Sequence, residues 1–382
     1  MTPRQVVVVG GGIIGLTVGW RAASAGAQVT VCDPAPGRGS SWAAAGMLAP
    51  IGEASAAEAP LTRLGLESVR RWPAFADELS ADAGCTPEDL GFRREGTLQV
   101  AFDDDDRRVL EELAAVHRLL GLESEVCSSR RCREIEPLLA PSVRGGLFVA
   151  GDWQVDPRRV VGALERALSR RGGRLVTSAV QRLRTTGEEG ARSVEGVELE
   201  DGSGLDAATV VLASGARAAL LEGLPEEAVP PVRPVKGEIL RLGATASGLR
   251  PSLTVRAHVR GQFVYVVPRT DGEVVVGATM QEAGFDTGVR AGAVLDLLRA
   301  AIDLLPALSE LSVSECLAAS RPGTPDNGPV LGPTPVDGLL LATGHHRNGV
   351  LLAPVTGDAL VGALSGGGLP REAASFTLGR FT

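Results

Sequence analysis

The chain has few aromatic residues, few methionines and almost no lysine. Of its 382 residues, 3% are aromatic; the only tyrosine is Tyr265 and the only lysine is Lys236. The two methionines after the first residue are Met47 and Met280. Against this background, a single tyrosine or methionine is a stronger candidate for a functional site than it would be in an average protein.

Cysteines are too sparse to build a disulfide framework or a metal site. They are Cys32, Cys85, Cys127, Cys132 and Cys316. Their number is odd, and no two of them have the C-x2-C spacing of a zinc or redox site. We therefore expect free thiols, no metal ion and a cytoplasmic location.

A surplus of basic residues and a long hydrophobic run are also missing. Lys and Arg number 38 against 46 Asp and Glu, and this net charge of −8 argues against a nucleic-acid partner. The longest apolar stretch, residues 6–20, contains five glycines and ends at Arg21. We therefore expect neither a membrane span nor a signal peptide.

The rest of the sequence alternates between two kinds of pattern. Residues 5–33, 157–215 and 339–364 read as strands and helices in alternation, which is typical of a parallel sheet covered by helices. Residues 232–280 read as short antiparallel strands, with Thr270-Asp271-Gly272 as a hairpin turn. The length exceeds that of a usual single domain. The sequence therefore predicts a mixed α/β (α+β) fold, in which a Rossmann-type domain is interleaved with an antiparallel-sheet domain.

A dinucleotide-binding fingerprint follows the first predicted strand. Gly10, Gly12 and Gly15 form G-x-G-x-x-G, and Asp33 ends the next strand, where a carboxylate can bind ribose hydroxyls. An acid at this position disfavours a 2′-phosphate, so NAD or FAD is expected rather than NADP. The turn Ala213-Ser214-Gly215-Ala216 resembles that of flavoproteins, and the C-terminal strand and helix are suited to closing over a flavin. Together these features favour FAD.

Five blocks of sequence resemble the glycine oxidases of thiazole (thiamin) biosynthesis, within the D-amino acid oxidase superfamily of FAD-dependent amine oxidoreductases. The blocks are residues 10–15, residues 43–48, residues 320–324, residues 344–354, and residues 265–269 with 277–280. The most specific of them is 344–354, Gly-His-His-Arg-Asn-Gly-Val-Leu-Leu-Ala-Pro. The resemblance covers nearly the whole chain. It implies an FAD-binding domain of residues 1–85, 145–228 and 314–382, and a substrate-binding domain of residues 86–144 and 229–313.

The resemblance also implies which residues hold a non-covalently bound FAD. The pyrophosphate would lie at Ile13 and Ile14, the ribose at Asp33 and Pro34, and the adenine at Val180. The complete implied set is Gly10, Gly12, Ile13, Ile14, Gly15, Asp33, Pro34, Ser40, Ser41, Ala45, Gly46, Met47, Val180, Ser214, Gly215, His345, His346, Arg347, Asn348, Gly349, Val350 and Leu351. A helix that begins near Val350 would direct its free amides toward the flavin, where reduction places negative charge.

Tyr265 and Arg321 are the residues expected to hold the carboxylate of an amino acid, because a guanidinium and a phenol both donate hydrogen bonds to it. Their ordinary alternatives are a core tyrosine bonded to backbone and a loop arginine bonded to carbonyls. We group Arg347 with them as a catalytic residue that gives backbone to the flavin and places its side chain near the substrate.

Met47, Phe263 and Met280 are expected to line the substrate pocket. Some glycine oxidases have a histidine where this chain has Phe263. The change from a polar to an apolar wall puts a strict preference for glycine in doubt. It would admit a larger or an N-alkylated amine.

The implied reaction is oxidative deamination of glycine, or of a small amine or D-amino acid, by hydride transfer to flavin N5. Its products are a 2-oxo acid, ammonia and H2O2. The partners are then a small-molecule substrate and O2, and the oligomers of the family imply a homo-oligomer. Two alternatives stay open: an FAD-dependent D-amino acid or secondary-amine (sarcosine-type) dehydrogenase or oxidase, and a non-catalytic flavin-bearing subunit.

Overall fold

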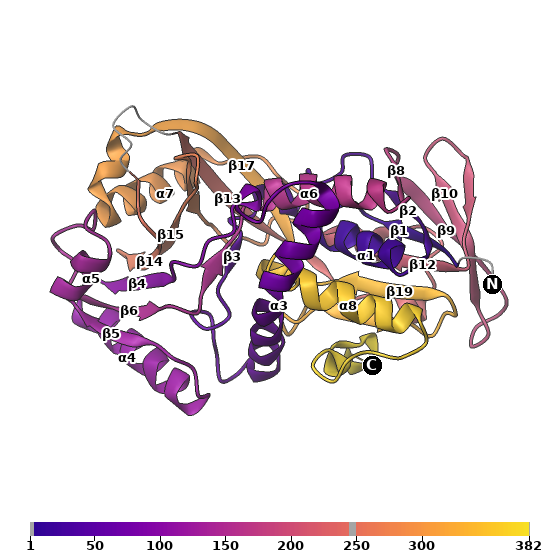
Figure 1. Ribbon diagram of the computed structural model, residues 1–382, viewed down its shortest axis with the longest axis horizontal. Helices are drawn as coiled ribbons and strands as arrows, with labels where there is room; N and C mark the ends of the chain where they lie inside the picture. Colours follow the sequence, from indigo (N-terminus) through magenta and orange to yellow (C-terminus); the bar gives the residue numbers. More distant parts are fainter. Residues whose placement is uncertain (1–3, 244–249, 382) are drawn as a thin grey trace.

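A computed structural model describes residues 4–243 and 250–381, in which the strands form two large sheets side by side along the long axis of the molecule (Figure 1). One sheet is six-stranded and mainly parallel, whereas the other is eight-stranded and mainly antiparallel. The mixed α/β fold predicted from the sequence is confirmed.

The six-stranded sheet has the order β18-β19-β12-β1-β2-β8, and only β18 runs antiparallel to its neighbour. Its strands are β1 (Gln5–Val9), β2 (Gln28–Cys32), β8 (Arg174–Val176), β12 (Thr209–Leu212), β18 (Val330–Pro333) and β19 (Leu339–Thr343). Residues 6–9 are four consecutive valines, and all four are buried. Such a run suits a parallel strand that is covered on both faces.

Helices cover one face of this sheet and a small sheet covers the other. The helices are α1 (Ile13–Ser24), α3 (Ala59–Ala83), α6 (Pro157–Arg170) and α8 (Ala353–Leu364). The small sheet is formed by β9 (Val180–Thr186), β10 (Ser193–Leu199) and β11 (Gly204–Asp206). Side chains of β9 and β10 share a buried cluster with those of β1 and β12. Figure 1 shows α1 and α8 in front of the six-stranded sheet.

The eight-stranded sheet has the order β17-β13-β16-β15-β14-β4-β6-β5, and all its pairs are antiparallel except β4 with β14. Its strands are β4 (Thr97–Ala101), β5 (Glu125–Ser128), β6 (Gly145–Val149), β13 (Arg233–Gly243), β14 (Thr254–Val259), β15 (Gln262–Pro268), β16 (Val274–Gly277) and β17 (Ser312–Gly323). Helix α7 (Ala291–Leu304) packs its buried leucines on one face. Helices α4 (Asp104–Leu119) and α5 (Ser129–Ile135) lie near its β5 edge (Figure 1).

Short elements connect the two large sheets. Helix α2 (Ser40–Ala43) leads to β3 (Met47–Leu48), which pairs with β7 (Trp153–Gln154). No helix among residues 4–243 and 250–381 is both long enough and apolar enough to cross a membrane.

The expected division into domains stays a prediction, and two strands bear on where its boundaries belong. β6 begins at Gly145, where an FAD-binding segment was expected to start, yet it pairs with β4 and β5 of the eight-stranded sheet. β17 crosses the expected boundary at residue 314 and pairs with β13 over its length. We propose that both strands belong with the substrate-binding segments.

Candidate active site

A large cavity of about 1020 Å3 lies between the two large sheets. Residues that follow the carboxyl ends of β1, β2, β12 and β19 line it from the six-stranded sheet, and residues of β13, β15 and β17 line it from the eight-stranded sheet. Ligands of open α/β sheets bind beyond the carboxyl ends of the strands. The cavity therefore joins a nucleotide-binding edge to the face of a second sheet.

The glycine-rich turn that follows β1 lies against the cavity and leaves little room for side chains. Gly10 has a φ of +108°, and a Cβ added there would lie 2.6 Å from the carbonyl oxygen of Ala213. A Cβ on Gly15 would lie 1.9 Å from the carbonyl oxygen of Gly10. Gly12 forms the N-cap of α1. Glycine at these positions lets helix, strand and turn pack closely beside the cavity, as the close approach of a pyrophosphate requires.

Asp33 holds this turn through its carboxylate. Its Oδ2 accepts a hydrogen bond of 2.7 Å from the amide of Gly11, and its Oδ1 accepts one of 2.8 Å from the amide of Ala35. Asp33 lines the cavity, so the same carboxylate fixes the turn and lies at the place expected for a ribose.

The loop between β19 and α8 lines the cavity with residues 345–350. Helix α8 itself begins at Ala353, three residues after the start near Val350 that the sequence predicted. Gly344 has a φ of +75°, and His346 has a φ of +48°, which is unusual for a residue with a side chain. The His345 ring contacts Thr356 at 3.0 Å, and burial lowers the pKa of His345 to about 3. Burial and the charges of Arg347 and Arg321 lower the pKa of His346 to about 4. Both histidines are therefore neutral at pH 7.

The side chains of Tyr265 and Arg321 approach each other above two glycines of the eight-stranded sheet. Tyr265 lies on β15 opposite Gly277 of β16, and a Cβ on Gly277 would lie 2.3 Å from the phenol oxygen. Arg321 lies on β17, and a Cβ on Gly237 of β13 would lie 2.4 Å from its guanidinium carbon. Since β13 and β16 are neighbours, the phenol and the guanidinium meet above these two strands, near the β17 edge of the sheet.

The local electrostatics suit an anion at this point. Through Nη1, Arg321 donates hydrogen bonds to the carbonyl of Thr279 at 3.1 Å and to that of Lys236 at 3.4 Å. Burial raises the pKa of Tyr265, although the charge of Arg321 opposes the effect. The phenol thus keeps its proton at neutral pH and can donate it to a carboxylate alongside the guanidinium.

The only lysine of the chain holds one wall of the cavity. Lys236 is fully buried on β13, and its Nζ donates a 2.9 Å hydrogen bond to Asp286 and a further one to the carbonyl of Gly288. These two residues flank Thr287, which lines the cavity. Lys236 therefore acts as a structural cation.

Arg347 lines the cavity, and its side chain forms ion pairs with two carboxylates. Its Nε lies 2.7 Å from Glu53, and its Nη2 lies 3.3 Å from Glu58. Glu53 also lies 3.1 Å from Nη2 of Arg256. Burial alone would raise the pKa of Glu53, but the charges of Arg256 and Arg347 hold it below its usual value.

The cavity gathers nearly all of the residues expected at the site. Tyr265, Arg321 and Arg347 line it, as do Met47, Phe263 and Met280, and every residue of the implied FAD set except Gly15 and Leu351. Gly15 lies behind the turn. The carbonyl of Leu351 points away, accepting hydrogen bonds from Ser68 at 2.6 Å and Trp72 at 3.0 Å. Met280 is 71% exposed, which places it at the rim.

Sequence reasoning missed Glu53 and Arg256, which also line the cavity. Arg256 lies directly opposite Tyr265 in the β14–β15 hairpin, so counting back from the turn at Gly261 could have found it. Glu53 lies outside every helix and strand, and no pattern in the sequence marks it. The two glycines under Arg321 and Tyr265 carried a readable signal, because a lone glycine in a strand marks a close approach.

A dinucleotide-binding edge beside a guanidinium and a phenol, both of which can donate hydrogen bonds to a carboxylate, is typical of a nucleotide-cofactor oxidoreductase. The chain belongs to the DAO family of FAD dependent oxidoreductases, whose model matches residues 5–363. The predicted FAD cofactor and the class of enzyme are confirmed.

Named relatives agree with this family. A glycine oxidase of Pseudomonas putida is 36% identical over 95% of each chain. The bifunctional protein ThiO/ThiG of Synechocystis is 34% identical over 93% of this chain, which spans 50% of that longer protein. The crystal structure of glycine oxidase from Geobacillus kaustophilus superposes with a TM-score of 0.87 at 31% identity, covering 98% of both chains. The resemblance to glycine oxidases found in the sequence is thereby confirmed.

Proposed function

We propose that the protein is an FAD-dependent oxidase that deaminates glycine or a similarly small amine or D-amino acid. An amino acid, O2 and water would give a 2-oxo acid, ammonia and H2O2. The observation that carries the proposal is the meeting of Arg321 and Tyr265 above Gly237 and Gly277, inside the cavity that receives the nucleotide-binding edge. The similarity to two glycine oxidases supports the same substrate class.

The roles of the side chains follow from their chemistry. Arg321 and Tyr265 would bind the substrate carboxylate and fix the direction of the Cα–H bond, and this orientation is the main requirement of a hydride transfer. When bound, FAD supplies the acceptor for the hydride. Residues of the turn after β1 and residues 345–350, which precede α8, line the cavity and would lie at the pyrophosphate and at the pyrimidine ring. Arg347, paired with Glu53 and Glu58, would close the wall beside the flavin rather than bind the carboxylate.

One observation favours a secondary amine as a second candidate substrate. Phe263 and Met47 pack with Tyr265 in an apolar cluster, and the ring of Phe263 lies 5.3 Å from the guanidinium carbon of Arg256. An N-methyl group of sarcosine would meet this apolar wall without leaving a polar group unpaired.

The test is anaerobic reduction of the bound flavin by glycine, sarcosine and D-alanine, followed by admission of O2 and a peroxide assay. We expect bleaching by at least one of these amines and stoichiometric H2O2. Bleaching without peroxide would instead identify a dehydrogenase. Absence of bleaching by all three amines would contradict the proposal and favour a non-catalytic flavin subunit.

Arg321→Met tests the assignment of the carboxylate site. Loss of a charged donor pair should lower kcat/KM by about a hundred-fold or more. The flavin content should stay unchanged, because the guanidinium contacts backbone carbonyls rather than the nucleotide-binding turn. Wild-type kcat/KM in this variant would refute the assignment.

We further propose a role in thiazole or thiamin biosynthesis, supported by the family resemblance and by the fused ThiO/ThiG relative. A cytoplasmic location is supported by the five cysteines, all of them free within the described residues. A homo-oligomer stays a prediction, which light scattering of the purified protein would test.

A further inference from the structure

Arg269 is a buried arginine on the hairpin that follows Tyr265, and within the part of the chain that the structure describes it donates only to backbone carbonyls. It is 3% exposed and comes four residues after Tyr265. Its Nη2 donates a 2.7 Å hydrogen bond to the carbonyl of Ala45, and its Nη1 donates one of 3.0 Å to the carbonyl of Val155. The guanidinium therefore bridges two segments that are far apart in the sequence.

The loop of residues 45–47 lines the cavity next to α2, and the segment of Val155 packs against it. The amide of Val155 donates a 2.9 Å hydrogen bond to the carbonyl of Gly46. Gly46 has a φ of +74°, and a Cβ added there would lie 2.0 Å from the carbonyl oxygen of Val155. Ala45, Gly46 and Met47 all line the cavity. Arg269 thus holds the Ala45–Met47 loop and the segment on which the loop packs.

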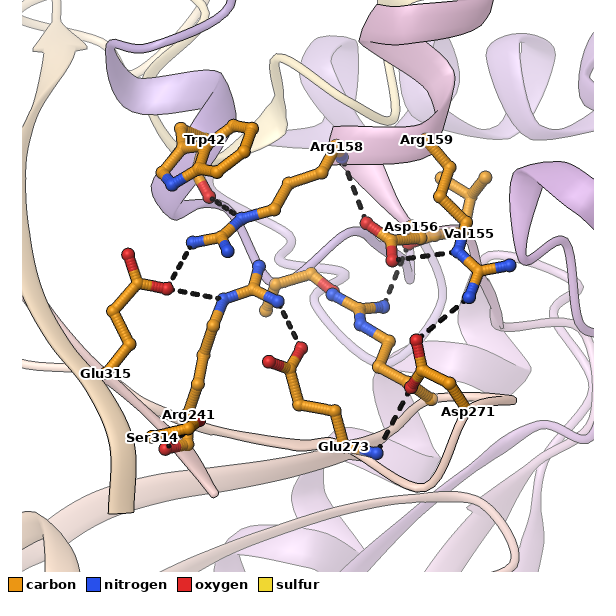
Figure 2. Close-up of polar contacts among 12 residues, drawn as sticks. Trp42, Val155, Asp156, Arg158, Arg159, Arg241, Asp271, Glu273, Ser314 and Glu315 are labelled. Carbon is orange, nitrogen blue, oxygen red and sulfur yellow. Dashed lines mark hydrogen bonds and ion pairs between the residues drawn. The ribbon is translucent and has the colours of Figure 1, made fainter. Parts of the chain in front are cut away.

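The neighbouring arginines at this junction behave differently. Figure 2 shows Arg158 paired with Glu315, Arg241 with Glu273, and Arg159 with Asp271. Each of these guanidinium groups faces a carboxylate, as buried cations usually do.

Arg269 has no such ion pair among the described residues, and its Nε has no hydrogen-bond partner there. Burial lowers the pKa of Arg269 to about 10, although the charges of Asp156, Glu273 and Asp271 oppose the shift, so the group remains charged at neutral pH. Burying a cation that contacts only carbonyls costs more free energy than burying one that is paired with a carboxylate. The planar guanidinium of arginine donates two hydrogen bonds in fixed directions. Lysine and methionine have no such group.

We propose that Arg269 is a positioning residue, which sets the distance between the Tyr265 strand and the Ala45–Met47 loop. The inference rests on the proposed function, since it assigns the strand to the substrate carboxylate and the loop to the flavin. Substrate and flavin are then held by two different sheets, and Arg269 connects them. Hydride transfer is sensitive to such a distance, because a misplacement of about 1 Å can lower a rate by about a hundred-fold.

The test compares Arg269→Met and Arg269→Lys with Arg159→Met as a matched control. Arg159 belongs to the same junction and contacts Asp271 and Asp156, but it donates to no carbonyl of the loop. The readouts are the limiting rate of anaerobic flavin reduction, the KM for the amine, the visible spectrum of the bound flavin, the Kd for FAD, and amide hydrogen exchange of residues 44–48 in the apoprotein.

For Arg269→Met we expect a limiting rate lowered by about ten- to a hundred-fold, with KM within about three-fold of wild type. The flavin spectrum should shift, FAD should bind more weakly, and the amides of residues 44–48 should exchange faster. Arg269→Lys should fall between wild type and Arg269→Met, and Arg159→Met should match wild type in every readout.

Several results would overturn the proposal. Wild-type exchange of residues 44–48 in either Arg269 variant would do so, because it would show that the loop does not depend on the guanidinium. Equal losses in Arg159→Met would show that any arginine of the junction has this effect and that Arg269 has no specific positioning role. If Arg269→Met does not fold, a wild-type limiting rate in Arg269→Lys would be decisive against a need for the fork. If no amine reduces the wild-type flavin, the proposed function fails, while the spectrum, the FAD affinity and the exchange data still decide the role of Arg269.

Discussion

At the scale of single residues, the candidate site depends as much on side chains that are missing as on those that are present. Arg321 and Tyr265 start from strands that are not adjacent, with β13 and β16 between them. They meet only because Gly237 and Gly277 leave the backbone of those two strands uncovered. The spacing of these two side chains is thus set by two glycines beneath them.

Gly277→Ala should separate the phenol from the guanidinium. A methyl group 2.3 Å from the Tyr265 oxygen cannot be accommodated unless the ring moves. We expect kcat/KM to fall by about ten- to a hundred-fold, while the flavin content stays at the wild-type level. Gly292→Ala is the control, because among the described residues nothing lies within 4 Å of a Cβ there. Full activity in Gly277→Ala would show that the ring position is unimportant.

Asp152 should make stability depend on pH. It is fully buried, and burial raises its pKa to about 7, although Arg256 and the amides of Ile51 and Gly52 oppose the shift. The unfolded chain has an Asp pKa of about 3.9. Between these values the folded state binds the extra proton, so the contribution of Asp152 to stability is lost as the pH rises toward 7.

Asp152→Asn removes this loss, because the amide cannot ionise. Relative to wild type, the variant should gain about 3 kcal/mol in free energy of unfolding between pH 5 and pH 8. Urea unfolding at the two pH values measures the difference, with Asp77→Asn, an exposed acid on α3, as the control. A constant offset between variant and wild type would contradict the raised pKa.

At the scale of elements, α4 offers a test that is independent of the site. Its N-cap residue Asp103 accepts hydrogen bonds from the amides of Asp105 at 3.0 Å and Asp106 at 2.8 Å. Asp103→Ala should lower the free energy of unfolding by about 1 kcal/mol. The cavity residues do not include α4, so kcat/KM should stay unchanged. A loss of activity at unchanged stability would contradict this prediction, because it would show that Asp103 affects the cavity in a way that its contacts do not explain.

The elements that the sequence predicts well are those whose pattern is local. The four valines of β1, the glycines of the first turn and the long amphipathic helices are examples, because burial and turn geometry act on neighbouring residues. Strands β4 and β6 carry no comparable pattern, and their place in the eight-stranded sheet depends on partners far away in the chain. Glu53 could not be predicted for the same reason, since its position follows from ion pairs to Arg256 and Arg347.

At the scale of the whole molecule, the cofactor should contribute to stability. The cavity lies between the two large sheets, so a ligand that fills it binds the folded state only. At a hundred times its Kd, FAD should raise the free energy of unfolding by about 2.7 kcal/mol. We expect the midpoint of thermal unfolding to rise by about 3 °C. ADP should give a smaller rise, and an unchanged midpoint with FAD would contradict the location of the site.

The single lysine has a consequence for the surface of the molecule. Lys236 is fully buried and paired with Asp286, so no lysine side chain is offered to solvent. Amine-directed dyes, cross-linkers and carbonyl compounds would then find no exposed lysine to modify in the folded chain. A protein proposed to release a reactive 2-oxo acid would thus have almost no nucleophilic amine of its own for that product to modify.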